Sequence, residues 1–293
     1  MKNLIKIEHL KKQYPNVTPL KDVNVEIHDG DGLRTTVFFK GCPLRCIWCH
    51  NPESLSFEKQ VAFFKNKCVS CGICENKRNE KTAESCPVNA IEVYGREYEL
   101  DELVEILLED EAFFRNSGGG VTLSGGESLL QPDFAVALLK ACKDNGINTA
   151  IETTGFANAE VIERFLPYLD TVLMDIKHID SDKHKEFTTQ PNERILENAK
   201  IIASKARKLI IRVPVIPTFN DTVAETAEIA AFAVSLPNVN EIHLLPYHNM
   251  GRDKYAGLGR EYGMGDLKSP TNELMQVLKQ TAEQFGLTVQ IGG

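Results

Sequence analysis

The stretch Gly-Cys-Pro-Leu-Arg-Cys-Ile-Trp-Cys-His, from Gly41 to His50, places three cysteines in one short segment, at Cys42, Cys46 and Cys49. Three thiolates can each bind one iron of a cubic iron–sulfur cluster, and the fourth iron is then left without a protein ligand. An iron with an open coordination position can bind a small molecule. The spacing therefore favours a catalytic [4Fe–4S] cluster over a cluster that only carries electrons.

Other kinds of cysteine site fit this stretch less well. A structural zinc site normally has a fourth Cys or His at a defined spacing, and His50 adjoins Cys49 too closely to be an easy fourth ligand. A disulfide scaffold is not expected in a chain of 293 residues that has no signal peptide. On spacing alone, a zinc site and inert thiols remain the alternatives to the cluster.

The spacing Cys-x3-Cys-x2-Cys resembles the signature of radical S-adenosylmethionine (SAM) enzymes. Further motifs resemble those of the activating enzymes of glycyl radical enzymes, such as the pyruvate formate-lyase activase, and they follow that family's order over roughly residues 27 to 290. These motifs are Asp29–Cys42 (DGDGLRTTVFFKGC), Ser117–Glu127 (SGGGVTLSGGE), Glu152–Phe156 (ETTGF), Leu173–Lys177 (LMDIK), Ile211–Pro217 (IRVPVIP) and Leu244–His248 (LLPYH).

The resemblance implies both a fold and a reaction. The fold is an α/β incomplete (β/α)6 radical SAM barrel, in which the chemistry lies at the C-terminal ends of the strands. The reaction is the reductive cleavage of SAM to methionine and a 5′-deoxyadenosyl radical. That radical removes a hydrogen from the α-carbon of one glycine in a partner glycyl radical enzyme, and a flavodoxin or ferredoxin is the implied electron donor.

The order of predicted elements agrees with a parallel sheet, because strands alternate with helices along the chain. We expect residues 31–56 and 99–293 to form the barrel, residues 57–98 to form a ferredoxin-like insert, and residues 1–30 to be an atypical segment. Strands are predicted at Thr35–Phe39, Val121–Leu123, Thr149–Glu152, Thr171–Asp175, Leu209–Val213 and Glu241–Leu245, and helices at Leu100–Phe114 (with Asp101 as its cap), Phe134–Asn145, Ala159–Leu166, Ile195–Ser204, Ala224–Ser235 and Thr271–Phe285.

A second group of cysteines lies in the predicted insert. Cys68, Cys71 and Cys74 have the spacing of a bacterial ferredoxin run, in which a Cys-Pro pair normally follows after three residues. Here eleven residues separate Cys74 from Cys86 and Pro87. We assign the four cysteines to one closed [4Fe–4S] cluster that relays an electron or shapes a docking surface; a four-cysteine zinc knuckle is the alternative.

Residues that match the family's SAM site lie just after predicted strands. Gly125 and Gly126 let the backbone approach a ligand, so that a carbonyl or the Glu127 side chain can receive the methionine ammonium of SAM. A plain tight turn is the alternative for the glycine pair taken alone. The resemblance further assigns Lys177 to the SAM carboxylate and His248 to the ribose or adenine.

The resemblance also assigns residues around the adenine, a cation and the partner peptide. Trp48, the only tryptophan, is expected to pack near adenine. Asp29 and Arg212 match positions near the bound glycine loop. The positions at which relatives bind a monovalent cation are Glu152, Thr153 and Asp175, and Glu152 replaces the more familiar aspartate.

The first residues depart from this family. Residues 1–31 contain Ile5–Tyr14 (IKIEHLKKQY) and Leu20–Asp31 (LKDVNVEIHDGD), which resemble the opening of an ABC-transporter ATPase. No Gly-x4-Gly-Lys-Ser/Thr loop occurs in the chain, so ATP hydrolysis is excluded. Val23–Ile27 alternates as a half-buried strand does, and it is the candidate substitute for the usual first barrel strand.

The composition is that of an ordinary acidic protein. The chain has 33 Lys and Arg against 41 Asp and Glu, a net charge of −8, and 42% hydrophobic residues. This balance does not indicate nucleic-acid binding, and no apolar run approaches the ~20 residues that cross a bilayer. Eight cysteines without a secretory signal favour a reducing, anaerobic cytoplasm, and we expect a monomer.

Two functions from other classes fit parts of the sequence. Another radical SAM enzyme that modifies peptides would share the core, but such enzymes more often carry a C-terminal cluster domain, whereas this insert lies in the first third of the chain. A non-catalytic, ferredoxin-like electron carrier would consume no SAM, and the open three-cysteine site argues against it.

Overall fold

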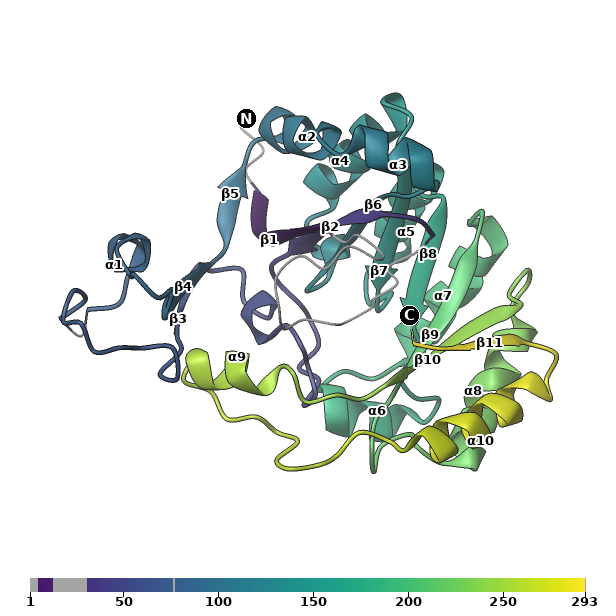
Figure 1. Ribbon diagram of the computed structural model, residues 1–293. Helices are drawn as coiled ribbons and strands as arrows, with labels where there is room; N and C mark the ends of the chain where they lie inside the picture. The colour runs from purple at the N-terminus through teal and green to yellow at the C-terminus, as the bar shows by residue number, and fades with distance from the viewer. Residues whose placement is uncertain (1–4, 13–30, 76, 293) are drawn as a thin grey trace.

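A computed structural model describes residues 5–12, 31–75 and 77–292. Within these residues, nine strands form one sheet in the order β11-β10-β9-β8-β7-β6-β2-β1-β5 (Figure 1). The strands are β1 (Ile5–Lys12), β2 (Arg34–Phe39), β5 (Arg96–Tyr98), β6 (Gly120–Gly125), β7 (Asn148–Thr153), β8 (Thr171–Asp175), β9 (Leu209–Val215), β10 (Glu241–Pro246) and β11 (Thr288–Ile291).

The larger part of this sheet is parallel and follows the order of the chain. β2 pairs with β6, β6 pairs with β7, and each later strand pairs with the next one as far as β11. β1 lies between β2 and β5 and is antiparallel to both, so that β5 and β11 form the edges. The sheet does not close on itself, which confirms the prediction of an incomplete barrel.

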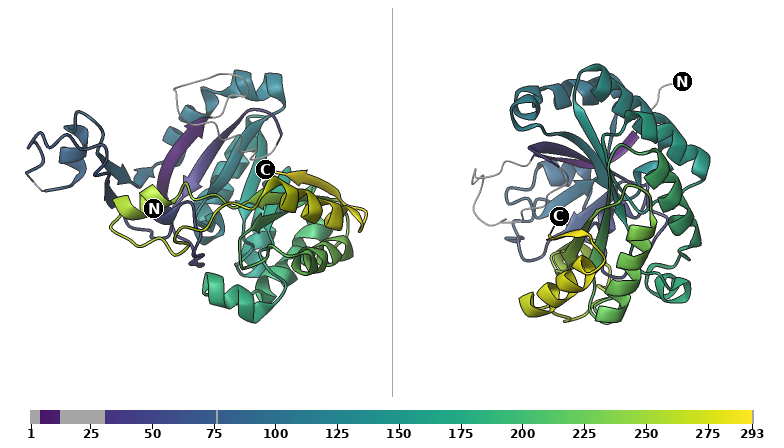
Figure 2. Two further views of the ribbon diagram at one scale, coloured as in Figure 1. Left: turned by 60° about the horizontal axis from the view of Figure 1, so that its bottom comes forward. Right: turned by 90° about the vertical axis from the view of Figure 1, so that its right-hand side faces the viewer.

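Helices connect the parallel strands, because a parallel pair needs a crossover connection. In the right-hand view of Figure 2, the teal and green helices curve along the outer side of the sheet. The described part of the chain contains no helix with both the length and the apolarity that a bilayer crossing requires. The helices of these connections are α2 (Leu100–Leu108), α3 (Glu111–Ser117), α4 (Pro132–Asp144), α5 (Ala159–Phe165), α6 (Ser181–Thr188), α7 (Glu193–Lys205), α8 (Val223–Ser235), α9 (Arg252–Gly257) and α10 (Asn272–Glu283).

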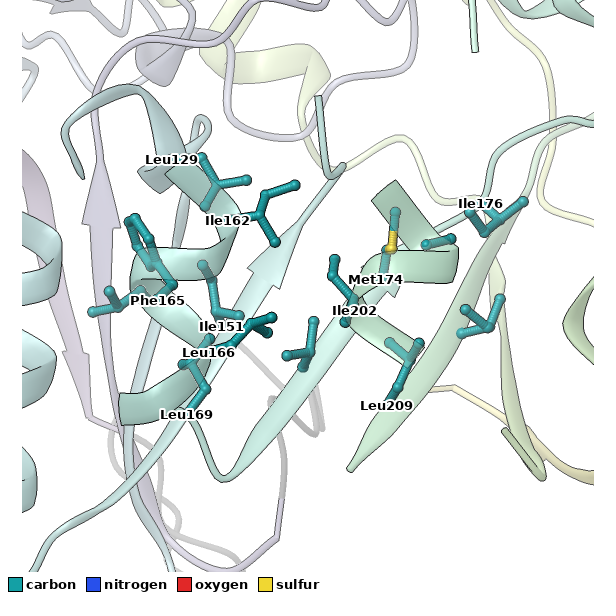
Figure 3. Packing of buried hydrophobic residues seen from close by; sticks show 14 of the residues in the cluster. Leu129, Ile151, Ile162, Phe165, Leu166, Leu169, Met174, Ile176, Ile202 and Leu209 are labelled. Atoms are coloured by element: carbon teal, nitrogen blue, oxygen red, sulfur yellow. The ribbon is translucent and has the colours of Figure 1, made fainter. Parts of the chain in front are cut away.

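The main hydrophobic core lies between the sheet and these helices. Successive side chains of a strand point to opposite faces, so alternate residues of each strand reach the helices. Figure 3 shows Ile151 of β7 and Met174 of β8 near Ile162 and Phe165 of α5 and Ile202 of α7, and all five are buried. Each such side chain contributes about 1.5–3 kcal/mol through its removal from water.

The inner face of the sheet carries polar side chains. Arg34 of β2 is buried, and its Nε donates to Oγ1 of Thr122 on β6 (2.7 Å). Another guanidinium N–H of Arg34 donates to Oδ1 of Asn148 on β7 (2.9 Å). These hydrogen bonds join three neighbouring strands at their N-terminal ends, which is the end opposite to the predicted site.

The insert forms a small unit beside the main sheet. β3 (Gln60–Phe63) and β4 (Ile91–Tyr94) pair in antiparallel fashion, and α1 (Glu80–Glu84) lies between them in the chain. This unit projects away from the main sheet at the left of Figure 1. β5 falls within the predicted range of the insert, but it joins the main sheet through β1.

Some sequence predictions differ from the structure. The helix predicted over residues 100–114 is two helices, α2 and α3, separated at Asp110, whose buried carboxylate accepts a hydrogen bond from Oγ1 of Thr35 (2.7 Å). Asp101 does not cap α2, because it lies in the first turn after Glu99. Val23–Ile27 lies outside the described residues, and β1 is the N-terminal strand that pairs with β2.

Glu225 links two outer helices, and its charge is expected to stabilise the fold. Its carboxylate accepts hydrogen bonds from Oγ1 of Thr222 at the start of α8 (2.7 Å) and from Nζ of Lys183 on α6. Burial would raise the pKa of Glu225, but these donors outweigh burial and lower the pKa to about 2. We predict that Glu225→Gln lowers the free energy of unfolding at pH 7 by about 1.5–3 kcal/mol, as is typical for hydrogen bonds to a charged group.

The effect of Glu225→Gln should also depend on pH. The carboxyl of the unfolded chain takes up a proton near its ordinary pKa of 4.5, whereas the folded carboxyl stays ionised down to about 2. The stabilisation is therefore complete above pH 4.5 and is lost as the pH falls toward 2. Chemical denaturation at two pH values measures this change, and Glu228→Gln on the exposed side of α8 is the control. An equal loss in both variants would contradict the prediction.

Candidate active site

The predicted cluster loop directly follows β2 and is held by a distant segment of the chain. The N–H of Arg45 donates to the carbonyl of Thr188 (2.8 Å), and the N–H of Ile47 donates to the carbonyl of Phe187 (3.2 Å). Both carbonyls belong to the last turn of α6. These bonds fix the loop at the C-terminal end of β2, where the sequence predicted the chemistry.

The thiols of this loop lie close enough to affect one another's ionisation. Burial, followed by the neighbouring Cys46 and Cys49, raises the pKa of Cys42 far above its ordinary value. Burial and Cys46 likewise raise the pKa of Cys49 to about 12. A cavity of about 640 Å³ opens beside Cys42 and Cys46. Crowded, half-buried thiolates are disfavoured unless cations neutralise them, so this donor set fits an iron–sulfur cluster.

The turn after β6 packs backbone to backbone against the start of the cluster loop. The N–H of Gly126 donates to the carbonyl of Phe39 (2.8 Å), and the N–H of Glu127 donates to the carbonyl of Gly41 (2.7 Å). A Cβ on Gly126 would lie 2.2 Å from the Gly41 oxygen. A Cβ on Gly125, whose φ is +99°, would lie 2.5 Å from backbone atoms of Phe39. The glycine pair is therefore required for contact between these two motifs.

Glu127 is buried, and the segment after β7 holds its carboxylate. Oε1 of Glu127 accepts a hydrogen bond from Oγ1 of Thr153 (2.8 Å). Oε2 accepts bonds from the N–H and Oγ1 of Thr154 (2.9 and 2.6 Å). Burial raises the pKa of Glu127, and these hydrogen bonds oppose the rise. The side chain thus connects the ends of β6 and β7 next to the glycine turn.

Charged side chains from neighbouring strands meet at the C-terminal ends on the inner face. Arg212 of β9 forms an ion pair with Glu152 of β7, and its Nε lies 3.6 Å from Oδ1 of Asp175 on β8. Ser124 of β6 donates a hydrogen bond to the other carboxylate oxygen of Glu152. Lys177 donates from Nζ to Oδ2 of Asp175 (2.6 Å). Each of the two carboxylates predicted to bind a cation is thus paired with a cationic side chain.

Lys177 is a buried, fixed positive charge beside the cluster loop. Burial disfavours the charged form, but Asp175 and then Cys46 outweigh burial and raise the pKa of Lys177 to about 12. A cation in such a position interacts strongly with an anionic group, because little water screens it. Its role in binding a carboxylate stays a prediction.

His248 follows β10 and stacks on His50 of the cluster loop. The ring centroids lie 3.6 Å apart with the planes inclined by 22°, and Nε2 of His50 donates to the His248 carbonyl (2.8 Å). Burial lowers the pKa of His248. Sequence reasoning missed His50, whose only signal is its position next to Cys49. Trp48 is buried against Phe219, with ring centroids 4.8 Å apart, in a second hydrophobic cluster.

The four cysteines of the insert line one small cavity. Its walls contain Cys68, Cys71, Cys74 and Cys86 together with apolar side chains. α1 occupies part of the eleven-residue spacer between Cys74 and Cys86. The N–H of Ala90 donates to Sγ of Cys86 (3.2 Å), and hydrogen bonds to sulfur are among the features that tune iron–sulfur clusters.

Both cysteine groups differ from a site for a single metal ion. Across the described ranges, no group of three or more His, Cys, Asp and Glu side chains is arranged around one metal-ion position. The thiolates of a [4Fe–4S] cluster each bind a separate iron, so their sulfurs surround a cube and do not meet at a point.

Most predicted site residues come together at one end of the sheet. The three-cysteine loop, the glycine turn and the charged layer lie at, or directly after, the C-terminal ends of strands β2 and β6 to β10. Asp29 lies outside the described residues. Sequence reasoning also missed Ser124, which carries no signal beyond its place before the glycine pair. Cys142 is buried in the main core.

Comparison with known proteins identifies relatives over almost the whole chain. The family model of the Radical SAM superfamily matches residues 36–230. The chain is 39% identical over 291 residues to the trans-4-hydroxy-L-proline dehydratase activating enzyme of Clostridioides difficile, which covers 91% of this chain and 96% of the relative. It is also 39% identical over 268 residues to the pyruvate formate-lyase 2-activating enzyme of Escherichia coli (strain K12), covering 91% of this chain and 89% of the relative.

A solved structure shows the same similarity. The crystal structure of a domain of pyruvate-formate lyase-activating enzyme from Bacteroides vulgatus ATCC 8482 matches with a TM-score of 0.51 and 35% identity. The match covers 60% of this chain and 99% of that chain.

Gly126→Ala is predicted to separate the glycine turn from the cluster loop. The new methyl group would meet a backbone oxygen that cannot rotate away, which costs about 1–3 kcal/mol of stability or more. Iron bound by the cluster loop should fall as the loop moves. Gly146→Ala is the control, because its cost of about 1–2 kcal/mol arises only from a left-handed backbone in open space. Iron analysis and thermal unfolding measure both variants, and unchanged iron in Gly126→Ala would contradict the prediction.

Proposed function

Because the chain belongs to the radical SAM superfamily and, within it, to the activating enzymes of glycyl radical enzymes, we propose that it removes a hydrogen atom from one glycine of a partner enzyme. The observation that carries this proposal is the loop of Cys42, Cys46 and Cys49 at the end of β2, packed against the glycine turn. When bound, a [4Fe–4S] cluster on these thiolates supplies the electron for the cleavage of SAM.

The groups around the loop have the chemistry to hold the methionine part of SAM. The carbonyls of the glycine turn are acceptors for the methionine ammonium, and Glu127, whose buried carboxylate accepts hydrogen bonds from Thr153 and Thr154, fixes the turn that presents them. Lys177, fixed by its hydrogen bond to Asp175 (2.6 Å), is a suitable partner for the methionine carboxylate. Acceptor and donor groups on two different strands would orient SAM before any bond is broken.

Two aromatic groups are proposed for the adenosine part. His248 has its ring orientation set by the stack on His50 and is assigned to the ribose or adenine. Trp48 belongs to the buried cluster beside the loop and is assigned to an apolar wall for adenine. Both would also keep water away from the reacting atoms.

The glycine loop of the partner is proposed to lie on the inner face. Arg212 is placed there beside Glu152 and Asp175, and its guanidinium can donate to a peptide carbonyl. Asp29 is assigned to the same loop through the resemblance of its motif.

The insert, residues 57–98, is proposed to hold a second, closed [4Fe–4S] cluster. Its support is the cavity lined by all four cysteines and the hydrogen bond to Cys86. A closed cluster has no position for SAM, so we assign it to electron relay from a flavodoxin or ferredoxin, or to docking of the partner. We propose that the protein works as a monomer in a reducing cytoplasm, where thiols remain free for metals.

The partner enzyme must be identified by experiment. Relatives of equal identity, 39%, are named for a hydroxyproline dehydratase and for a pyruvate formate-lyase, so this level of similarity does not select one partner. A panel of glycyl radical enzymes, incubated with the reconstituted protein and SAM, would reveal the partner through the electron paramagnetic resonance signal of a glycyl radical.

We predict that the anaerobically reconstituted protein forms 5′-deoxyadenosine from SAM and dithionite. Cys46→Ala should abolish this product, because only two thiolates would remain in the loop to bind the cluster. Cys142→Ala changes a buried cysteine of the outer core and should retain it. Absence of 5′-deoxyadenosine from the fully loaded wild type would contradict the proposal. Formation of 5′-deoxyadenosine without a radical on any partner would favour another peptide-modifying reaction.

We also predict about eight irons per chain, four in each cluster. Cys71→Ser should lower the content to about four irons, while dithionite, which needs no relay, should still support 5′-deoxyadenosine formation. Ser85→Ala, a neutral change beside Cys86, should retain the full iron content. Chemical iron analysis tests this directly, and about four irons in the wild type would mean that the insert holds no cluster.

A further inference from the structure

We propose that the guanidinium of Arg212 takes the place of the monovalent cation that the family's motif implies, so that this chain binds SAM without an alkali-metal ion. The inference rests on the proposed function of the site. It starts from the layer formed by Ser124, Glu152, Asp175 and Arg212 on four neighbouring strands.

Each carboxylate of the implied cation site already faces a cationic side chain, and Oδ1 of Asp175, which has no hydrogen bond among the described residues, lies 3.6 Å from Nε of Arg212. Glu152 is paired with Arg212, and Asp175 accepts a hydrogen bond from Lys177 (2.6 Å). Thr153 donates its hydroxyl hydrogen to a buried glutamate (2.8 Å). The two carboxylates and the two cationic side chains carry no net charge together. These residues therefore do not fit an additional alkali-metal ion.

The Arg212 guanidinium contacts both carboxylates, which is where an ion that bridges them would have to bind. Asp175 lies opposite Arg212 in the pairing of β8 with β9, and Glu152 lies one strand further away on β7. The Arg212 side chain crosses β8, so that its guanidinium contacts both carboxylates. At an effective dielectric constant of 20, repulsion from this group would offset about 4 kcal/mol of the attraction between the carboxylates and a metal ion added at 4 Å from the guanidinium. Arginine cannot relieve this by losing its proton.

The length of the Glu152 side chain explains why the Arg212 guanidinium can contact a carboxylate on β7. Glu152 is longer than an aspartate by one methylene, which adds about 1.5 Å of reach toward Arg212. The guanidinium is attached to the chain and loses little freedom on pairing, whereas an ion from solution loses its translational freedom. With aspartate at this position, the gap to Arg212 would reopen and an ion would again be needed to balance the carboxylates.

The test compares SAM binding in K⁺ and in tetramethylammonium at equal ionic strength. Isothermal titration of the reconstituted protein, with its clusters oxidised, gives the dissociation constant of SAM without turnover. For the wild type, we expect a change of less than about twofold between the two salts. For Glu152→Asp, we expect SAM to bind about tenfold more weakly without K⁺.

A matched control is Glu241→Asp, which shortens a carboxylate at the start of β10 that accepts a hydrogen bond from His243 (2.9 Å). This variant should remain independent of K⁺. Dependence of the wild type on K⁺ would overturn the inference. Independence of both the wild type and Glu152→Asp would also overturn it, because the contact with Arg212 would then not decide ion binding. Failure of the proposed function is a separate result, namely absence of 5′-deoxyadenosine in either salt.

Discussion

The contact between the cluster loop and the turn after β6 positions the other groups at this end of the sheet. It consists of main-chain hydrogen bonds from Gly126 to Phe39 and from Glu127 to Gly41, formed where no Cβ would fit. The Glu127 side chain extends the same contact to Thr154 after β7. Motifs that are far apart in sequence are thus coupled through backbone atoms, and a change of rotamer cannot loosen this coupling. The thiols, the glycine carbonyls and the charged layer are therefore placed relative to one another before any ligand binds.

The outer face of the sheet contributes hydrophobic packing, and the inner face carries the charged groups proposed for the chemistry. The outer face packs aliphatic and aromatic side chains against the helices, and its contribution comes from the removal of apolar area from water. The inner face carries buried charges, which are costly unless each has a partner. Arg34 at one end, and Arg212 and Lys177 at the other, satisfy this condition through short contacts across neighbouring strands. The charged layer at this end of the sheet is thus held by ion pairs, and a second hydrophobic cluster around Trp48 and Phe219 packs beside the cluster loop.

Local patterns predicted most of the fold, and contacts between distant residues account for what they did not predict. The prediction of Thr171–Asp175 matches β8 at both ends, because a short apolar run lies there between Asp170 and Asp175. The break between α2 and α3 escaped prediction because Asp110 finds its partner, Thr35, 75 residues earlier. The stack of His50 on His248 joins residues 198 positions apart, and the pairing of Glu152 with Arg212 depends on a side chain that crosses a strand. The cysteine spacings were visible in sequence, whereas such side-chain pairings were not.

The short helix α1 takes up part of the chain between Cys74 and Cys86, so the length of the insert does not determine where its cysteines lie. Its first turn is closed by a reciprocal cap between Asn79 and Thr82, and the chain then returns to the cavity at Cys86. Residues can therefore be gained or lost in the bridge between Cys74 and Cys86 during evolution without displacing either sulfur. A signature that fixes the interval before the fourth cysteine would overlook chains built in this way. A shared cavity lined by the four cysteines identifies related inserts better than the number of residues between the cysteines does.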